Sequence, residues 1–220
     1  TFFDLCDQKG IMVWQDFSFA CAVYPQDKQL FDAVEQEIRT VLQRLRRHPC
    51  IVLWAGDNEC DLVMSRSVGD RNPNCNQLTR KVIKELVEFE DPTRPYLPSS
   101  PFYDEEAYQI GRQYITENHL WGPRDYYKSD FYTQSLCHFV SEIGYHGCPS
   151  PASIKRFISP EYLWPWKDNP EWIIHAANDS GDPHAIYAHR IPLMAKQIRE
   201  LFGEIPDNLE EFSLASQISQ

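Results

Sequence analysis

Two glutamates, Glu59 and Glu142, are the clearest candidates for catalysis in this sequence, because each follows a short apolar segment. Glu59 comes after residues 50–58 and Glu142 comes directly after residues 139–141. A single glutamate in such a place is more often a helix cap or an ion-pair partner. Two carboxyl groups that meet can cleave a glycosidic bond, because one protonates the leaving oxygen while the other attacks the anomeric carbon or activates water.

The elements that must position these groups alternate along the chain. Short apolar runs predict buried strands at 11–14, 50–54 and 139–141, with shorter candidates at 96–98 and 114–118. Helical spacing and end signals predict helices between and after them, at 2–9, 29–47, 79–88, 153–157, 171–177, 189–202 and 208–218. Such alternation is typical of a parallel sheet with helices outside, either a barrel or an open doubly wound sheet.

The polar residues decide between these two architectures. No GxGxxG or GxxxxGK[ST] motif follows any predicted strand, so the usual signs of a dinucleotide site or a P-loop are missing. Instead, polar side chains stand where strands end, at Asp16, Glu59, His119 and Glu142. Barrel enzymes collect their catalytic groups from the carboxyl ends of several strands, so this placement favours an α/β barrel.

Composition excludes several classes of partner. The net charge is −11 and the longest basic run is Arg46-Arg47, which argues against nucleic acid because phosphate binding needs clustered cations. No apolar run approaches the roughly 20 residues of a membrane span. The seven cysteines include no CxxC pair and are expected to be free thiols, which slightly favours a cytoplasmic location. No signal-peptide pattern opens the chain, but residues 1–4 resemble the middle of a helix, so this gives no information on targeting.

Other catalytic chemistries find little support. No GxSxG motif occurs, and Ser141 precedes Glu142 without a recognisable histidine partner. Cys60 and Cys148 are interpreted as packing thiols, because no activating base is identifiable. The histidines show no convincing ligand spacing, so we assign no metal and no cofactor.

Three stretches closely resemble the β-mannosidase branch of glycoside hydrolase family 2, namely 2–25, 44–59 and 139–150. Two weaker stretches, 91–101 and 117–122, agree with the same alignment. The sequence departs from the family pattern at three positions: Asp57 stands where Asn is more usual, Glu117 where Asp is, and His146 where Gln is commoner.

The resemblance implies roles for individual residues. Glu59 would be the acid/base and Glu142 the nucleophile of a retaining mechanism, which needs their carboxyl groups about 5–5.5 Å apart and a raised pKa at Glu59. Asn58 would donate to the 2-hydroxyl of the sugar. Four residues are candidates for the pocket wall, and for both tryptophans a purely packing role stays open: Trp14, Asp16, His119 and Trp121.

The resemblance also implies the architecture. It predicts a single domain over 1–220 that forms part of a (β/α)8 TIM barrel, approximately strands 3 to 7 with their helices, without strands 1, 2 and 8 or the flanking β-sandwich domains. A complete barrel takes about 250 residues, so exposed edges that promote self-association are expected.

The implied function is that of a retaining exo-β-glycosidase for terminal β-linked sugars, with β-mannosides favoured. Related branches cleave β-galactosides, β-glucuronides and β-glucosaminides. An alternative is a non-catalytic carbohydrate-binding or inactive fragment of such an enzyme, which would keep the fold but lack the activity. In both interpretations the partner is a carbohydrate.

Overall fold

The computed structural model describes residues 1–66, 71–111, 114–121, 130–144, 146–177 and 190–220. The chain forms two compact units. Unit 1 comprises residues 1–119 and 136–141, and unit 2 comprises residues 120–135 and 142–220. Each unit is described by itself below.

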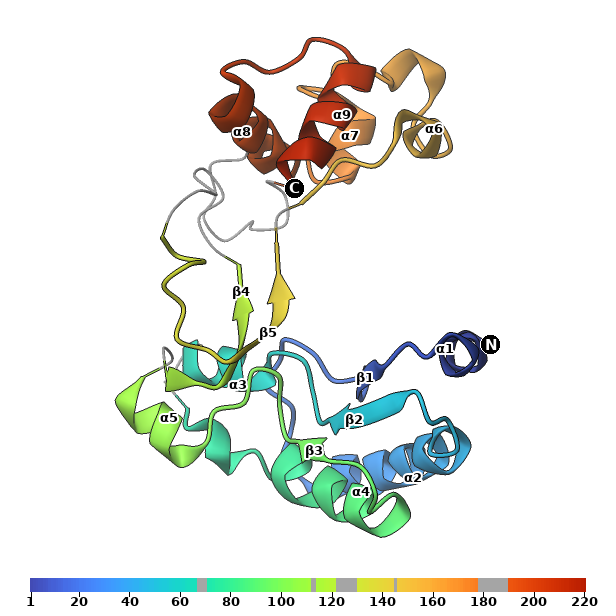
Figure 1. Ribbon diagram of the computed structural model, residues 1–220, viewed down its shortest axis with the longest axis vertical. Coiled ribbons are helices and arrows are strands. Elements are labelled where there is room, and N and C mark those ends of the chain that lie inside the picture. The colour runs from blue at the N-terminus through green and yellow to red at the C-terminus, as the bar shows by residue number, and fades with distance from the viewer. Residues whose placement is uncertain (67–70, 112–113, 122–129, 145, 178–189) are drawn as a thin grey trace. The chain divides into compact units, whose positions relative to one another are not determined.

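Unit 1 contains a three-stranded parallel sheet with the order β1-β2-β3 (Figure 1). The strands are β1 (Val13–Asp16), β2 (Ile51–Ala55) and β3 (Tyr96–Leu97). In their register Asp16 lies opposite Ala55, and Ala55 lies opposite Leu97. The three strands therefore end together, and the segments that follow them meet at one edge of the sheet.

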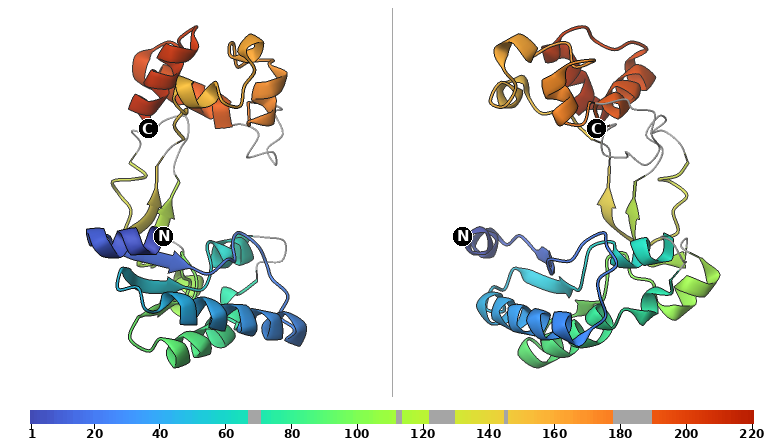
Figure 2. Two further views of the ribbon diagram at one scale, coloured as in Figure 1. Left: turned by 90° about the vertical axis from the view of Figure 1, so that its right-hand side faces the viewer. Right: turned by 180° about the vertical axis from the view of Figure 1, so that it is seen from behind.

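Helices cover one face of this sheet. They include α2 (Lys28–Leu45) and α4 (Lys84–Glu90), which lie side by side in all views (Figures 1 and 2). A π-helical turn, η2 (Leu78–Ile83), runs directly into α4. The side chain of Asp27 accepts a hydrogen bond from the backbone N–H of Leu30 and so begins α2. Further helices of unit 1 are α1 (Phe2–Lys9), α3 (Cys60–Arg66) and α5 (Glu105–Ile110).

The core of unit 1 lies between the sheet and these helices. Fully buried side chains from the helices and from β2 meet there, including Ile38, Leu42, Ile51, Trp54 and Ile83. Burying one such side chain contributes roughly 1.5–3 kcal/mol relative to leaving it in water.

The turn between α4 and β3 is held by one arginine. Arg94 donates hydrogen bonds to the backbone carbonyls of Arg46, His48 and Ile51 and to the Asp91 carboxylate. Because Arg46 and His48 follow α2, this side chain ties the end of a helix and the start of β2 to the turn that begins β3. The amino ends of β2 and β3 are thereby aligned.

The remaining strands, β4 (Glu117–Leu120) and β5 (Phe139–Ile143), form a two-stranded sheet. The boundary of the units passes through both strands, so residues 117–119 and 139–141 belong to unit 1.

Unit 2 is built from helices. These are α6 (Pro151–Ile154), α7 (Pro170–Ile174), α8 (Arg190–Phe202) and α9 (Leu209–Ser219). Its own core gathers Ile154, Trp172, Ile198 and Phe212. Unit 2 therefore has a hydrophobic cluster whose members differ from those of unit 1.

The predicted α/β class is confirmed, and several boundaries change. The expected strand 114–118 is β4 at Glu117–Leu120, so His119 lies within a strand and not after it. Glu142 likewise lies inside β5. Helices α3 and α5 were not predicted. The expected start of the last long helix at residue 189 lies outside the described residues. Within the described part of the chain, no helix is both long and apolar enough to cross a membrane.

Candidate active site

The segments after β1, β2 and β3 continue side by side past the sheet. Asn58 forms parallel bridges with Ala20 on one side and with Ser100 on the other. The backbone N–H of Glu59 then donates to the carbonyl of Ser100 at 2.7 Å. Glu59 has a φ of 61°, a left-handed conformation that is rare for a residue with a long side chain. Its backbone is therefore held in a strained position by these neighbours.

The carboxylate of Glu59 meets the ring of His119. Glu59 Oε1 and His119 Nδ1 are 2.8 Å apart. The histidine is buried, whereas the Glu59 side chain is 21% exposed. Glu59 thus has one oxygen fixed by a buried ring and remains accessible from outside.

Behind His119 lies a chain of buried polar groups. Ser100 Oγ is 3.0 Å from His119 Nε2 and donates to Glu117 Oε1 at 2.9 Å. Ser141 Oγ donates to the same oxygen of Glu117. Ser100, Glu117 and His119 are all buried, so bulk water does not replace these hydrogen bonds. We name Glu59, His119, Ser100 and Glu117 the Glu59 relay.

The hydrogen bond from His119 lowers the pKa of Glu59, and it outweighs the opposing effect of burial. Cys21 adds to this effect, because its Sγ donates to Glu59 Oε2 at 3.4 Å. The expectation of a raised pKa at Glu59 is therefore wrong for this structure. The physical reason is that His119 and Cys21 both hydrogen-bond to this carboxylate, and these two contacts could not be recognised in the sequence.

Asn58 and Cys21 complete the surroundings of Glu59. The backbone N–H of Cys21 donates to the carbonyl of Asn58 at 2.8 Å, and the Asn58 side chain reaches Cys21 Sγ at 3.7 Å. Asn58 is partly exposed, so its amide stands beside the accessible side of Glu59.

Asp57 lies on the opposite, fully buried side of the same segment. Its Oδ1 accepts from Ser99 Oγ at 2.5 Å and from the backbone N–H of Cys60 at 3.0 Å. Its Oδ2 has no hydrogen-bond partner among the described residues. Burial without a counter-charge raises the pKa of Asp57 to about 7. This residue therefore supports the loop and does not face outward with Glu59.

Trp14 and Asp16 contact each other at the end of β1. Trp14 Nε1 donates to Asp16 Oδ1 at 2.9 Å. One face of the Trp14 ring stacks on Phe139, with 5.8 Å between centroids and 10° between planes. Trp14 is half-buried, so only part of its surface remains for any other contact.

Glu142 belongs to unit 2, where its neighbour is Trp121. The indole N–H of Trp121 donates to Glu142 Oε2 at 2.8 Å. The Trp121 ring stacks on His146 at 5.8 Å between centroids and is 39% exposed. Glu142 thus has one carboxylate oxygen oriented by an indole N–H.

A group of side chains that could ligate a metal ion lies elsewhere in unit 1. Asp4, Asp7 and His48 bring single ligand atoms within 4.8 Å of one another. These atoms already have protein partners, because Asp7 contacts His48 Nδ1 at 2.7 Å and accepts from the N–H of Cys50 at 2.8 Å. Asp4 accepts from Thr1 in the capping box of α1. The carboxylate and imidazole set is therefore satisfied by structural contacts.

The structure thus brings Glu59, Asn58 and His119 together in unit 1, with Trp14 and Asp16 paired at the end of β1. It brings Glu142 and Trp121 together in unit 2. The sequence interpretation did not single out Ser100 or Cys21. Ser100 could have been noticed, because it stands after β3 as Glu59 stands after β2; Cys21 carried no such signal.

Known proteins resemble this chain over most of its length. It is 35% identical to β-mannosidase of Bos taurus over an alignment of 184 residues, which covers 76% of this chain and 21% of that protein. It is 30% identical to β-mannosidase of Mus musculus over an alignment of 217 residues, which covers 89% of this chain and 23% of that protein. The chain therefore spans between a fifth and a quarter of the length of these relatives.

A solved structure gives the same relationship in three dimensions. The β-D-mannosidase of Dictyoglomus thermophilum matches 100% of this chain and 26% of its own, with a TM-score of 0.80 and 30% identity. A scan against family models found no match. From the shared sequence and the shared fold, this chain belongs to the β-mannosidase-like branch of glycoside hydrolase family 2.

Proposed function

We propose that this chain carries the catalytic carboxylates of a retaining exo-β-glycosidase that hydrolyses terminal β-mannosides. Glu59 is the acid/base and Glu142 is the nucleophile. The observation that carries the proposal is the Glu59 relay, because it places an accessible carboxyl group against a buried, hydrogen-bonded histidine. The mannosidase relatives support the choice of sugar.

The relay accounts for one proton that Glu59 and His119 share. Ser100 has a single hydroxyl proton, which it donates to Glu117, so His119 Nε2 must donate to the Ser100 oxygen. The contact between His119 Nδ1 and Glu59 then holds one proton, whichever of the two groups carries it. Glu59 and His119 therefore act as a pair that keeps a proton next to the leaving oxygen.

Chemistry proceeds in two displacements. Glu142 attacks the anomeric carbon while Glu59 gives its proton to the departing oxygen, and a covalent glycosyl-enzyme forms. Glu59 then takes a proton from water, whose oxygen attacks the anomeric carbon and releases Glu142. Trp121 donates a hydrogen bond to one oxygen of Glu142 and so orients the carboxylate for attack. Asn58 donates to the 2-hydroxyl of the sugar, and Trp14, Asp16, His119 and Trp121 form the pocket wall.

The proposal extends to the architecture. The strands β1 to β5 correspond to strands 3 to 7 of a (β/α)8 barrel within one catalytic domain. The parallel order of β1, β2 and β3 and the coincident ends of these strands support this assignment. The match to a β-D-mannosidase over the full chain also supports it.

The test uses the longest natural polypeptide that contains these residues. Glu142→Gln should abolish turnover of a nitrophenyl β-mannoside. Glu59→Gln should lower turnover by about 10²–10⁴-fold for a poor leaving group and much less for dinitrophenolate, which needs no proton. The first product detected by NMR should be the β-anomer. Unchanged turnover in Glu142→Gln would overturn the nucleophile assignment, and an α-anomer as first product would overturn the retaining mechanism. No turnover by the parent polypeptide would favour a non-catalytic role.

A further inference from the structure

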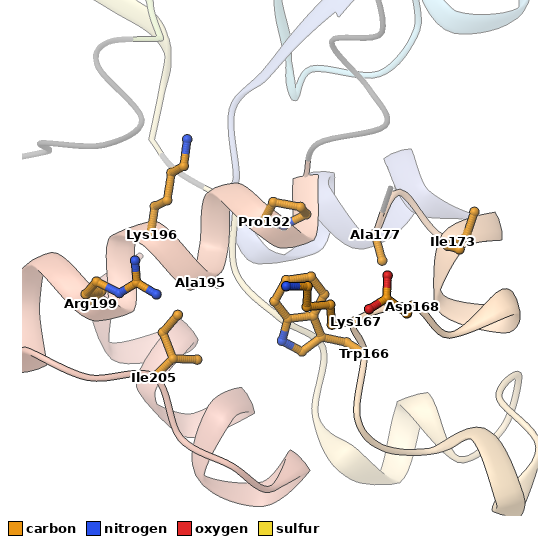
Figure 3. A pocket seen from close by; sticks show the side chains of 10 residues that line it. All are labelled: Trp166, Lys167, Asp168, Ile173, Ala177, Pro192, Ala195, Lys196, Arg199 and Ile205. Carbon is orange, nitrogen blue, oxygen red and sulfur yellow. The ribbon is translucent and has the colours of Figure 1, made fainter. Parts of the chain in front are cut away.

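Unit 2 contains a pocket of about 520 Å³ that is formed by the loop before α7 and by one side of α8 (Figure 3). This volume lies within the range of about 300–1,000 Å³ that small-molecule sites occupy. Small apolar side chains, among them Ala177, Pro192 and Ala195, form part of the wall. None of the lining residues has a role in the proposed hydrolysis.

An aromatic ring lies in the middle of this pocket. Trp166 is half-buried, and its indole occupies the centre of the view in Figure 3. It packs against Phe212 of the unit 2 core, with 6.3 Å between ring centroids. Its N–H has no hydrogen-bond partner among the described residues, although a tryptophan N–H usually finds one when it is buried. The ring thus offers both a flat face and an unused donor.

The charges around the ring are unbalanced. Three cations line the pocket, Lys167 from the loop and Lys196 and Arg199 from α8, against one carboxylate, that of Asp168. Within the described part of the chain, none of these four side chains forms an ion pair or a hydrogen bond. In a chain of net charge −11, such a local excess of positive charge favours an anion.

The loop that carries Trp166 is fixed in advance. The buried side chain of Asn169 donates to the carbonyls of Tyr162 and Pro165 at 2.7 and 2.9 Å. Its Oδ1 accepts from the first N–H groups of α7. The opposite wall is equally fixed, because Ile191 and Ile198 hold α8 in the unit 2 core. A ligand would therefore meet walls that need little rearrangement.

We infer that this pocket binds a pyranose that carries a negative charge, such as a carboxylate or a phosphate ester. The sugar face stacks on Trp166, the anionic group meets Arg199 and Lys196, and Asp168 accepts from hydroxyl groups. The inference does not depend on the proposed hydrolysis, because it uses none of the residues assigned to that reaction.

Calorimetry and saturation-transfer NMR on the longest natural polypeptide test this inference. The probes are glucuronate, glucose 6-phosphate, neutral glucose and inorganic phosphate. We expect both anionic sugars to bind at least about tenfold more tightly than glucose or phosphate, because only they satisfy the ring and the cations together. Equal binding of glucose, or of phosphate alone, would overturn the inference, as would no binding of either anionic sugar.

Two substitutions locate the binding. Arg199→Gln should weaken glucuronate by about 10- to 100-fold, as expected for loss of a charged hydrogen bond. Lys155→Gln removes the same charge from a site on unit 2 where Lys155 pairs with Glu210, so it should change affinity less than about twofold. The conservative Trp166→Phe should abolish the ligand-induced shift of one indole N–H signal. Equal affinities in Arg199→Gln and Lys155→Gln would overturn the inference.

Discussion

Asp57 and His119 show how single buried side chains set the chemistry of the segment around Glu59. Asp57 is surrounded by neutral donors, and one of its oxygens has no partner among the described residues. His119 contacts Glu59 on one side and Ser100 on the other. Both residues therefore couple protonation to the geometry of the loop, and each gives a prediction.

Asp57 makes stability depend on pH. The folded protein holds a proton on Asp57 up to a pKa of about 7, whereas the unfolded chain loses it near its ordinary value of 3.8. Folding therefore takes up a proton between about pH 4 and pH 7, so this group's contribution makes stability fall as pH rises through that window. Asp57→Asn should remove this fall and stabilise the protein at pH 7 by about 2–4 kcal/mol.

Urea unfolding between pH 4 and pH 8 measures the effect. Asp32→Asn is the matched control, because Asp32 is an exposed carboxylate that pairs with Lys28 on α2. It should leave the pH slope of the parent protein unchanged. The same slope in Asp57→Asn as in the parent would contradict the prediction.

With Glu59 as the proposed acid/base, His119 is expected to influence the pH limit of activity. Its hydrogen bond lowers the pKa of Glu59, so His119→Phe should raise that pKa and move the basic limb of the kcat/KM profile to higher pH while activity falls. His119→Asn keeps a donor near the position of Nδ1 and should therefore keep part of the lowering of the Glu59 pKa. Its basic limb should lie between those of the parent protein and of His119→Phe. Identical basic limbs in the two variants would refute this role.

At the scale of elements, the join between β2 and Glu59 is tightly packed. A methyl group on Gly56 would lie 2.3 Å from the carbonyl oxygen of Pro98 and 2.4 Å from the hydroxyl of Tyr96. Gly56 also donates to the carbonyl of Leu97 at 2.8 Å. The chain after β2 therefore runs against the chain after β3 with no space between them.

Gly56→Ala should accordingly destabilise unit 1 by about 1–3 kcal/mol or more and should also reduce activity, because the backbone must move next to Glu59. Gly10→Ala is the comparison, since Gly10 has a φ of +65° but an added methyl group there meets nothing within 4 Å. It should cost about 1–2 kcal/mol and leave activity unchanged. Initial rates distinguish the two variants, because only Gly56→Ala should lower them, while urea midpoints measure the loss of stability in each. Equal initial rates would count against the steric argument.

The individual strands and helices show how much of the fold could be predicted from the sequence. The strands β1 and β2 were found because they are short apolar runs between breakers, and α2 because its apolar residues recur at helical spacing. The strand β4 was misplaced because Glu117, Asn118 and His119 are polar yet buried. Hydrophobic patterns do not identify a strand whose side chains bury hydrogen bonds. The Glu59 relay was missed because its members come from three separate segments, whose proximity in space the sequence does not show.

At the scale of the molecule, the two units have separate cores. Leu42 is fully buried in unit 1, and Phe212 is fully buried in unit 2. Leu42→Ala should cost about 2–5 kcal/mol and accelerate amide exchange in α2 and β2 while leaving α8 and α9 unchanged. Phe212→Ala should do the reverse. Hydrogen-exchange mass spectrometry reports both, and acceleration of all four elements by either variant would show that the cores unfold together.

Gly56 also bears on how this protein can diverge. A position that accepts only hydrogen, next to the residue proposed as acid/base, leaves the path from β2 to Glu59 almost closed to mutation. New substrate preferences would therefore have to arise in β1 and in the segments after β4 and β5, where partly exposed side chains such as Trp14 and Trp121 can be exchanged. Sequences selected for a different sugar should vary there first, and should keep glycine at this position.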